Sequence, residues 1–182
     1  MQSPMGREVL DNNEGCRPVD SASAIFDLYA KSVIEVFYGH GVVAVIPDGV
    51  EPIGDGFAAV PSPFGGDGGW VITAWNPRSA GGLSLEQNRG RNAELRRFLV
   101  EEGAEMLDAV GRSRSGDVAE ESFYCTGLDQ GVVLALGERF EQNAVFHLDA
   151  IRLSVVGVLI DDRRTIGYSV WTRANRSPPK TG

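Results

Sequence analysis

Four polar side chains that are suited to binding a ligand lie close together near the middle of the sequence. Asn76 follows an apolar, β-branched run, and a helix pattern then places Asn88, Arg91 and Asn92 on one face. Burying such groups without hydrogen bonds costs roughly 1–3 kcal/mol each, so they must be paired or face a pocket. A guanidinium at a helix start, with free N–H groups and the helix dipole, favours a phosphate or a carboxylate. The pattern predicts either an anion-binding pocket or a buried network in which Arg91 and Asn88 hold the preceding loop.

A second polar group follows later in the chain and consists of Glu120, Ser122, Gln142 and Asn143. A carboxylate beside a hydroxyl is suited to a general base or to a metal ligand. It is also suited to capping a strand end or pairing with Arg91, and we favour that structural role over catalysis. Gln142 and Asn143 directly follow a predicted helix, where they either cap it or reach the same pocket. These residues and the first four are the candidate ligand-binding residues, and no catalytic residue is assigned.

A strand followed by a helix positions the first group. Residues 71–75 have the composition of a buried strand, and Pro77 marks its end because proline cannot donate to a sheet. Ser84 and Gln87 match a capping box, which predicts a helix over about 85–102. We therefore expect the end of the strand and the polar start of the helix to share one locality.

The rest of the chain is read as strands with a second main helix, for which Asp129 is the predicted cap. Two hairpins are predicted, with strands at 32–38 and 41–46 and at 152–160 and 165–172. This order predicts an α+β fold, a single domain over residues 24–172 with one mixed or antiparallel sheet and two main helices. Residues 1–23 are predicted to be a flexible leader and residues 173–182 a flexible tail.

Charge and composition narrow the classes of function. The chain has 17 basic and 25 acidic residues and a net charge of −8, which disfavours a nucleic-acid partner. Such a binder would need a local basic patch, for which the candidates are Arg89, Arg91, Arg96, Arg97, Arg112 and Arg114. The sequence has neither a signal-peptide pattern nor a run of 18 apolar residues, so no membrane association is expected. The two cysteines, Cys16 and Cys125, make no disulfide framework, which predicts a cytoplasmic location.

The sequence lacks the spacing of known metal and phosphate motifs. His40 and His147 are its only histidines and lie far apart, and no CxxC or HxxxH occurs, so no metal site is predicted. The glycines from Gly65 to Gly69 lack the lysine and the hydroxyl residue of a P-loop. The cofactor is therefore unknown from sequence.

Part of the sequence resembles a known family. The residues that carry the resemblance are Ile72 to Pro77, Leu83-Ser84, Asn88, Arg91-Asn92 and Leu95, together with the later stretches 116–122 and 140–146. They resemble the signature of domain of unknown function 3293 (DUF3293), a family of bacterial and phage proteins, over residues 71–149. The resemblance implies one compact domain with polar residues gathered near Asn76, and it implies no activity. The family pattern has tryptophan where Val118 stands and glycine where Glu141 stands, so the loop before Glu120 is expected to differ in shape.

Two functions from different classes fit these features. The first is a domain that binds, and as an enzyme would process, a nucleotide or another small anionic metabolite around Asn76, Asn88 and Arg91. The alternative is a protein-binding regulatory module, such as a phage- or bacterium-encoded inhibitor of a host or defence factor. The acidic charge and the missing catalytic motif favour the alternative, and the helix start with its guanidinium favours the first.

Overall fold

The computed structural model describes residues 21–39, 41–50, 58–60, 63–65 and 67–174. Their strands form a closed, eight-stranded antiparallel barrel with one additional short strand, so the predicted α+β fold is wrong. In chain order the elements are α1 (Ser21–Tyr29), β1 (Val33–Tyr38), β2 (Gly41–Pro47), β3 (Ala58–Val60), β4 (Gly69–Ile72), the 3-10 turn η1 (Pro77–Ser79), α2 (Leu85–Glu101), β5 (Glu105–Arg112), β6 (Ala119–Thr126), α3 (Gln130–Arg139), β7 (Ala144–Leu148), β8 (Arg152–Gly157) and β9 (Arg163–Ala174).

The barrel closes because its last strand pairs with its second. Neighbours follow the order β2-β1-β5-β6-β4-β7-β8-β9, and β9 then pairs with β2 from Gly41↔Ala174 to Pro47↔Tyr168. The short strand β3 pairs with β9 beyond the part of β9 that β8 occupies.

The antiparallel pairing decides which segments meet at each end of the barrel. All neighbouring strands are antiparallel, so the starts of β1, β6, β7 and β9 lie at the same end as the finish of β4. We call this the α1 end, because α1 leads directly into β1. The other is the opposite end.

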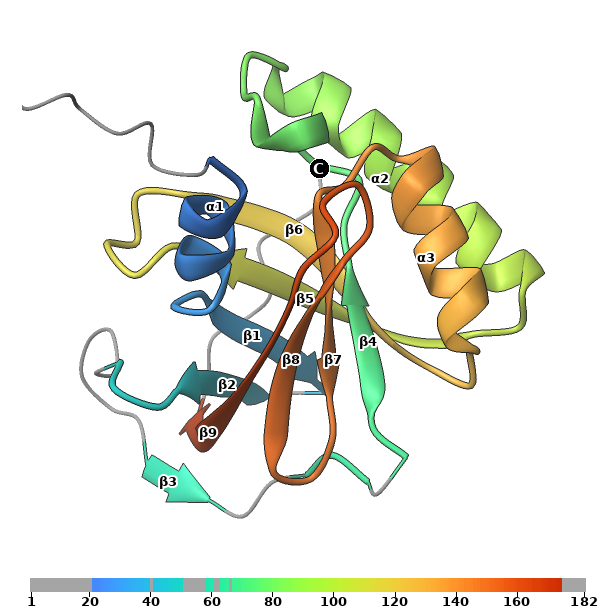
Figure 1. Ribbon diagram of the computed structural model, residues 1–182. Helices are drawn as coiled ribbons and strands as arrows, with labels where there is room; N and C mark the ends of the chain where they lie inside the picture. The colour runs from blue at the N-terminus through green and yellow to red at the C-terminus, as the bar shows by residue number, and fades with distance from the viewer. Residues whose placement is uncertain (1–20, 40, 51–57, 61–62, 66, 175–182) are drawn as a thin grey trace, which may run out of the picture.

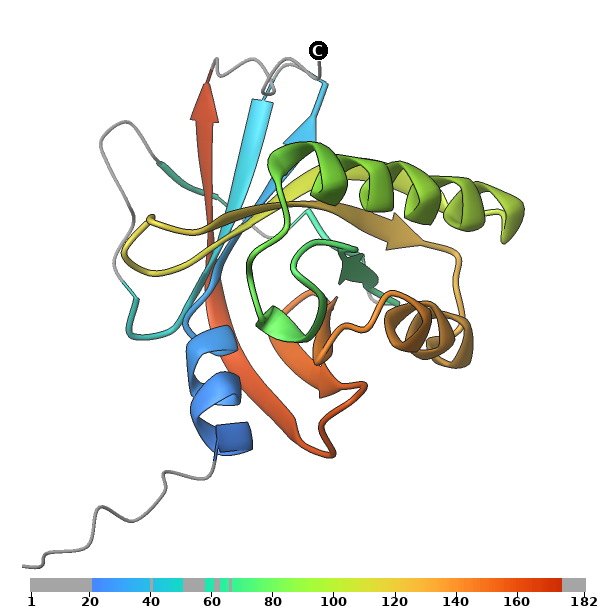
Figure 2. The ribbon, with the colours of Figure 1, turned by 90° about the horizontal axis from the view of Figure 1, so that it is seen from above.

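The two larger apolar clusters of the described residues stabilise this arrangement. The first contains side chains from all eight barrel strands and therefore fills the interior; its buried members are Ile34, Val36, Val43, Val45, Phe64, Val71, Ala109, Tyr124, Leu148, Leu153 and Val170. The second lies outside the barrel, where Leu95 and Leu99 of α2 and Val133 and Leu136 of α3 pack on β4, β6, β7 and β8. Burying such a side chain fully contributes about 1.5–3 kcal/mol. Both helices cover one side of the barrel, and α1 lies away from them (Figure 1 and Figure 2).

Several local predictions are confirmed. The β1–β2 and β8–β9 hairpins are present, and α2 begins after Ser84, whose side chain forms the predicted capping box with Gln87. Helix α3 follows Asp129, although the Asp129 side chain makes no capping hydrogen bond. Strand β4 ends at Ile72 rather than at Trp75, because the intervening backbone bonds to side chains instead of to a neighbouring strand.

The described residues cover both predicted boundaries of the domain, at residues 24 and 172, but not the whole leader and tail. Helix α1 begins at Ser21, inside the predicted leader, and β9 continues to Ala174, inside the predicted tail. The remaining leader and tail, with Cys16, and also His40, lie outside the described residues. Among the helices that the structure describes, none is long and apolar enough to cross a membrane.

Candidate functional site

The segment that follows β4, residues 73–79, is held by side chains from α2, β6 and the chain after α3. We call it the Asn76 loop. Its residues Asn76, Arg78 and Ser79 have φ angles of 42°, 56° and 54°. This left-handed region costs a side-chain-bearing residue of order 1–2 kcal/mol, so it persists only where surrounding contacts fix it. The loop is therefore a stretch of strained backbone that the rest of the fold keeps in place.

The side chains of Arg91 and Asn92 on α2 form hydrogen bonds with backbone groups. Asn92 Oδ1 accepts from the Ala74 N–H at 2.8 Å, and Asn92 Nδ2 donates to the Glu121 carbonyl at 2.7 Å. Arg91 donates through Nε to the Ala74 carbonyl at 2.8 Å and through a terminal nitrogen to the Phe140 carbonyl at 2.7 Å. The polar stripe on α2 thus ties the Asn76 loop to β6 and to the end of α3.

Asn76, Asn88 and Glu120 form a connected cluster. The Asn76 N–H donates to Asn88 Oδ1 at 3.0 Å, and Asn88 Nδ2 donates to Asn76 Oδ1 at 3.2 Å. Asn76 Nδ2 donates in turn to Glu120 Oε1 at 2.7 Å. Within the described residues, Glu120 Oε2 accepts no hydrogen bond and no cation lies at ion-pair distance from the carboxyl. Burial raises the pKa of Glu120, and the hydrogen bond from Asn76 lowers it by less.

Strand alternation places this carboxyl at the inner rim of the barrel. Glu120, Ser122 and Tyr124 share one face of β6, and Tyr124 belongs to the interior cluster. Ser122 is buried and donates through Oγ to the Glu120 carbonyl at 3.1 Å. Glu121 lies on the outer face, where its carboxylate pairs with Arg89 of α2 at 2.9 Å. The two adjacent carboxyl groups therefore differ: the outer one pairs with Arg89, whereas no cation from the described residues pairs with the inner one.

Gln142 and Asn143 complete the predicted set. Gln142 Nε2 donates to the Trp75 carbonyl at 2.9 Å, which anchors the start of the Asn76 loop. Asn143 Nδ2 lies 3.2 Å from Ser79 Oγ and 3.4 Å from Tyr29 Oη, and these two hydroxyls share a hydrogen bond of 2.5 Å. Tyr29, from α1, was not predicted, and no spacing or motif around it in the sequence indicates its role.

Trp75 differs from these residues, because the polar atom of its side chain has no hydrogen-bond partner among the described residues. Its side chain is buried, with 9% exposed, and its indole Nε1 is the single buried side-chain nitrogen or oxygen without a hydrogen-bond partner among the described residues. Native proteins contain few such atoms, and an unmade bond of this kind costs about 1–3 kcal/mol. This unsatisfied donor directly precedes Asn76 in the chain.

Glu141 stands where the sequence resemblance implies glycine. Its φ of 55° lies in the left-handed region that glycine adopts readily, so the backbone here has the conformation that the pattern implies. The Glu141 carbonyl accepts from the Arg78 N–H at 2.7 Å, and its carboxylate pairs with Arg78 Nε at 3.0 Å. The substitution therefore adds an ion pair to the Asn76 loop without requiring a different backbone.

The site shows no arrangement of metal ligands. Among the described residues, no three side chains of His, Cys, Asp or Glu gather as a metal site would require. Cys125 lies in the core of β6, where burial raises its pKa to about 12, so its thiol is a poor nucleophile near neutral pH.

Comparison with known proteins identifies one family. Residues 72–145 match the family model described as "Protein of unknown function (DUF3293)", which confirms the sequence resemblance over that segment. The comparisons with curated proteins and with solved structures gave no match. The matched segment runs from the end of β4 to the start of β7 and contains all eight predicted site residues. The barrel strands β1, β2, β8 and β9 lie wholly outside it, as does α1.

Proposed function

We propose that this domain binds a small molecule at Glu120 and Asn76, and that the bound group presents nitrogen hydrogen-bond donors. An ammonium, a guanidinium and the amino edge of a nucleobase are groups of this kind. The observation that carries the proposal is the inner-rim carboxyl of Glu120, which has one oxygen without a partner and no cation nearby among the described residues.

The energetics of a partly buried carboxylate support this choice. Removing a carboxylate from water is costly unless a cation or several donors compensate for the lost solvation. Among the described residues one donor, Asn76, reaches the Glu120 carboxyl, and a ligand would add further donors through charge-assisted hydrogen bonds. Each side-chain amide carries two N–H groups, and the amides of Asn76 and Asn88 each use one of them within this cluster.

The rigidity of the Asn76 loop supports the same function. Its three left-handed residues are each held by a hydrogen bond: Asn76 by Asn88, Arg78 by Glu141 and Ser79 by Asn143. A binding group that is already fixed loses little conformational entropy when the ligand arrives. Strained backbone that is fixed in this way is common at ligand sites.

The charge around Asn76 argues for a donor group rather than a phosphate at this position. Arg91 was predicted either to bind an anion or to hold the preceding loop, and its Nε and one terminal nitrogen bind the carbonyls of Ala74 and Phe140. A nucleotide would then bind through its base, with the phosphate elsewhere. Binding of an anionic metabolite and the regulatory-module alternative both stay predictions, and the first is included in the experiment below.

The test is a thermal-shift and calorimetric screen of the full chain with two panels. One panel contains amines and guanidinium compounds, and the other contains nucleosides, nucleotides and sugar phosphates. The variants are Glu120→Gln and the matched control Glu121→Gln, which removes the adjacent carboxylate from the outer face. A ligand at about a hundredfold its Kd stabilises the folded state by roughly 2.7 kcal/mol.

The expected result is a donor-bearing ligand that stabilises the wild type and Glu121→Gln but not Glu120→Gln. A ligand that stabilises all three proteins equally would contradict the assignment to Glu120. Stabilisation by phosphates alone would overturn the proposal in favour of the anion site.

A further inference from the structure

Helix α1 rests on the α1 end of the barrel through a few anchors. It has nine residues, and isolated helices of this length are not stable in water. Phe26 is fully buried, and the Tyr29 ring packs edge-on against Phe146, an interior residue of β7, at 6.1 Å. The Tyr29 hydroxyl reaches Ser79, while Leu28 is 68% exposed. The helix is therefore held by tertiary contacts at discrete points rather than by a continuous apolar face.

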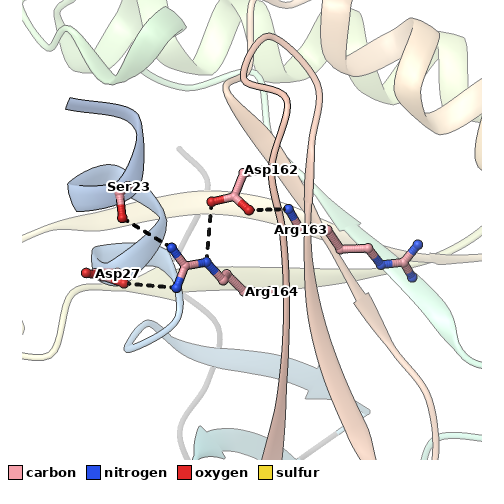
Figure 3. Close-up of polar contacts among 5 residues, drawn as sticks. All are labelled: Ser23, Asp27, Asp162, Arg163 and Arg164. Carbon is pink, nitrogen blue, oxygen red and sulfur yellow. Dashed lines mark hydrogen bonds and ion pairs between the residues drawn. The ribbon is translucent and has the colours of Figure 1, made fainter. Parts of the chain in front are cut away.

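The third anchor is Arg164, at the start of β9 (Figure 3). Its guanidinium contacts α1 at two places, at 3.5 Å from the Asp27 carboxylate and 3.2 Å from Ser23 Oγ. Its Nε also lies 3.3 Å from Asp162 Oδ2. The other oxygen of Asp162 accepts from the backbone N–H of Arg163 at 2.7 Å, so the hairpin itself orients the arginine that holds α1.

The two neighbouring arginines of this hairpin point in different directions. Arg164 pairs in register with Val155 and lies at the inner rim, whereas Arg163 pairs with Val156, which packs in the outer cluster. Figure 3 shows the Arg163 side chain directed away from α1. Arg163 is therefore a control for Arg164 that matches it in charge, strand and hairpin.

We propose that α1 is a closing helix, which opens as a unit about residues 30–32 while the barrel stays folded. Opening separates Asp27 and Ser23 from Arg164 and Tyr29 from Ser79 and Asn143, and it removes Phe26 from its buried position. All of these contacts join α1 to other elements, and each barrel strand keeps both of its neighbours when they are lost. The α1 end thus has a closed and an open state, and Arg164 sets the balance between them.

The test is residue-resolved hydrogen exchange of the full chain without any ligand, so that it stands apart from the proposed function. In the wild type, the amides of residues 25–30 are expected to exchange with one common opening constant. Their exchange should be at least about a hundredfold faster than that of central amides in β5 and β6, and insensitive to low urea, as local openings are. Arg164→Met should accelerate all of them about tenfold and leave β5 and β6 unchanged, because it removes two contacts to α1. Arg163→Met should change neither set.

Three results would overturn the proposal. The first is wild-type α1 exchange that matches β5 and β6 in rate and urea dependence, which would make α1 part of the global unfolding unit. The second is a graded loss of protection from one end of α1, which would be fraying rather than opening as a unit. The third is an equal response to Arg164→Met and Arg163→Met. The wild-type measurement decides the first two outcomes even if a variant folds poorly.

Discussion

The two ends of the barrel are built from different chemistry. At the α1 end, amide, guanidinium and hydroxyl groups bond to backbone that has left the sheet, as Asn92 does with Ala74 and Gln142 with Trp75. At the opposite end, the interior contains aromatic rings, with Phe64 packed against Tyr124 and Tyr168 at centroid distances of 5.1 and 6.4 Å.

The tyrosines of the opposite end show how closely this region is packed. Burial, followed by the nearby phenols of Tyr38 and Tyr168 and the thiol of Cys125, raises the pKa of Tyr124 to about 12. A Cβ on Gly69 would lie 2.5 Å from the Tyr124 ring, so glycine is required for the close approach of β4 to this ring. Close packing of rings, rather than directed hydrogen bonds, therefore stabilises this end.

The stability of the α1 end depends on single polar atoms, and that of the opposite end does not. At the α1 end, individual polar atoms satisfy backbone groups that no strand partner reaches, and their loss leaves those groups buried and unpaired. At the opposite end, ring volume matters more than any one hydroxyl. Each of the following predictions tests one side of this difference.

Asn92→Ala should have the largest effect. It removes the partner of the Ala74 N–H and one of the two side-chain donors to the Glu121 carbonyl, which keeps the Thr73 hydroxyl. We expect a loss of about 2–4 kcal/mol in the free energy of unfolding, measured by urea denaturation. The control is Arg97→Ala on the exposed side of the same helix, which should change stability by less than about 0.5 kcal/mol. Equal, small effects of both variants would remove the distinction between the two ends.

Removing single hydroxyls at the opposite end should cost less. Tyr168→Phe deletes the hydrogen bond from the Tyr168 hydroxyl to the Asp149 carbonyl and should cost about 1 kcal/mol. The Tyr124 hydroxyl makes no hydrogen bond among the described residues, so Tyr124→Phe should stay within about 0.5 kcal/mol of the wild type. Thermal and urea denaturation of both variants would check this order. A larger loss for Tyr124→Phe would mean that directed polar contacts hold this end too.

Glu120→Gln should have the smallest effect, and its sign should depend on pH. Burial raises the pKa of Glu120 in the folded chain, so folding favours the protonated carboxyl. That contribution is fully present below the pKa of the unfolded chain and is lost as the pH rises through the folded pKa. The variant should therefore gain stability relative to wild type as the pH rises above 4.5, the ordinary value for this group.

The measurement is the difference in unfolding free energy between Glu120→Gln and wild type at a series of pH values. Glu121→Gln controls for the change in net charge, since it removes a carboxylate on the outer face that is paired with Arg89. A difference that stays constant with pH, or that falls as the pH rises, would contradict the burial of Glu120 at the inner rim.

The local structure of the protein was predictable from short-range patterns, and the closure of the barrel was not. The capping box at Ser84 and Gln87 and the glycine-bounded hairpin of β1 and β2 depend on neighbours in sequence. Alternation along a strand is the same in an open sheet covered on one face and in a barrel. What closes the sheet is the pairing of β9 with β2, a choice of distant partner that neither strand's composition reveals.

The candidate site was predictable to a similar degree. The helical spacing of Asn88, Arg91 and Asn92 showed that they share a face, and the structure brings them together with Asn76 and Glu120. That Arg91 and Asn88 hold the preceding loop was one of the two predictions, but the individual acceptors could not be predicted, because backbone carbonyls carry no sequence signal. Tyr29 was missed for the same reason, since its contact with Ser79 depends on where α1 lies across the barrel end.

The pairing of β2 with β9 also has a consequence for how the chain acquires its structure. Roughly 120 residues separate the partners, so β2 emerges from the ribosome long before the strand that completes its hydrogen bonds. During that interval one edge of the first hairpin is available to other chains. Such non-local closure is slow compared with helix or hairpin formation, which predicts that folding speed, more than final stability, limits the yield of this protein at high expression rates.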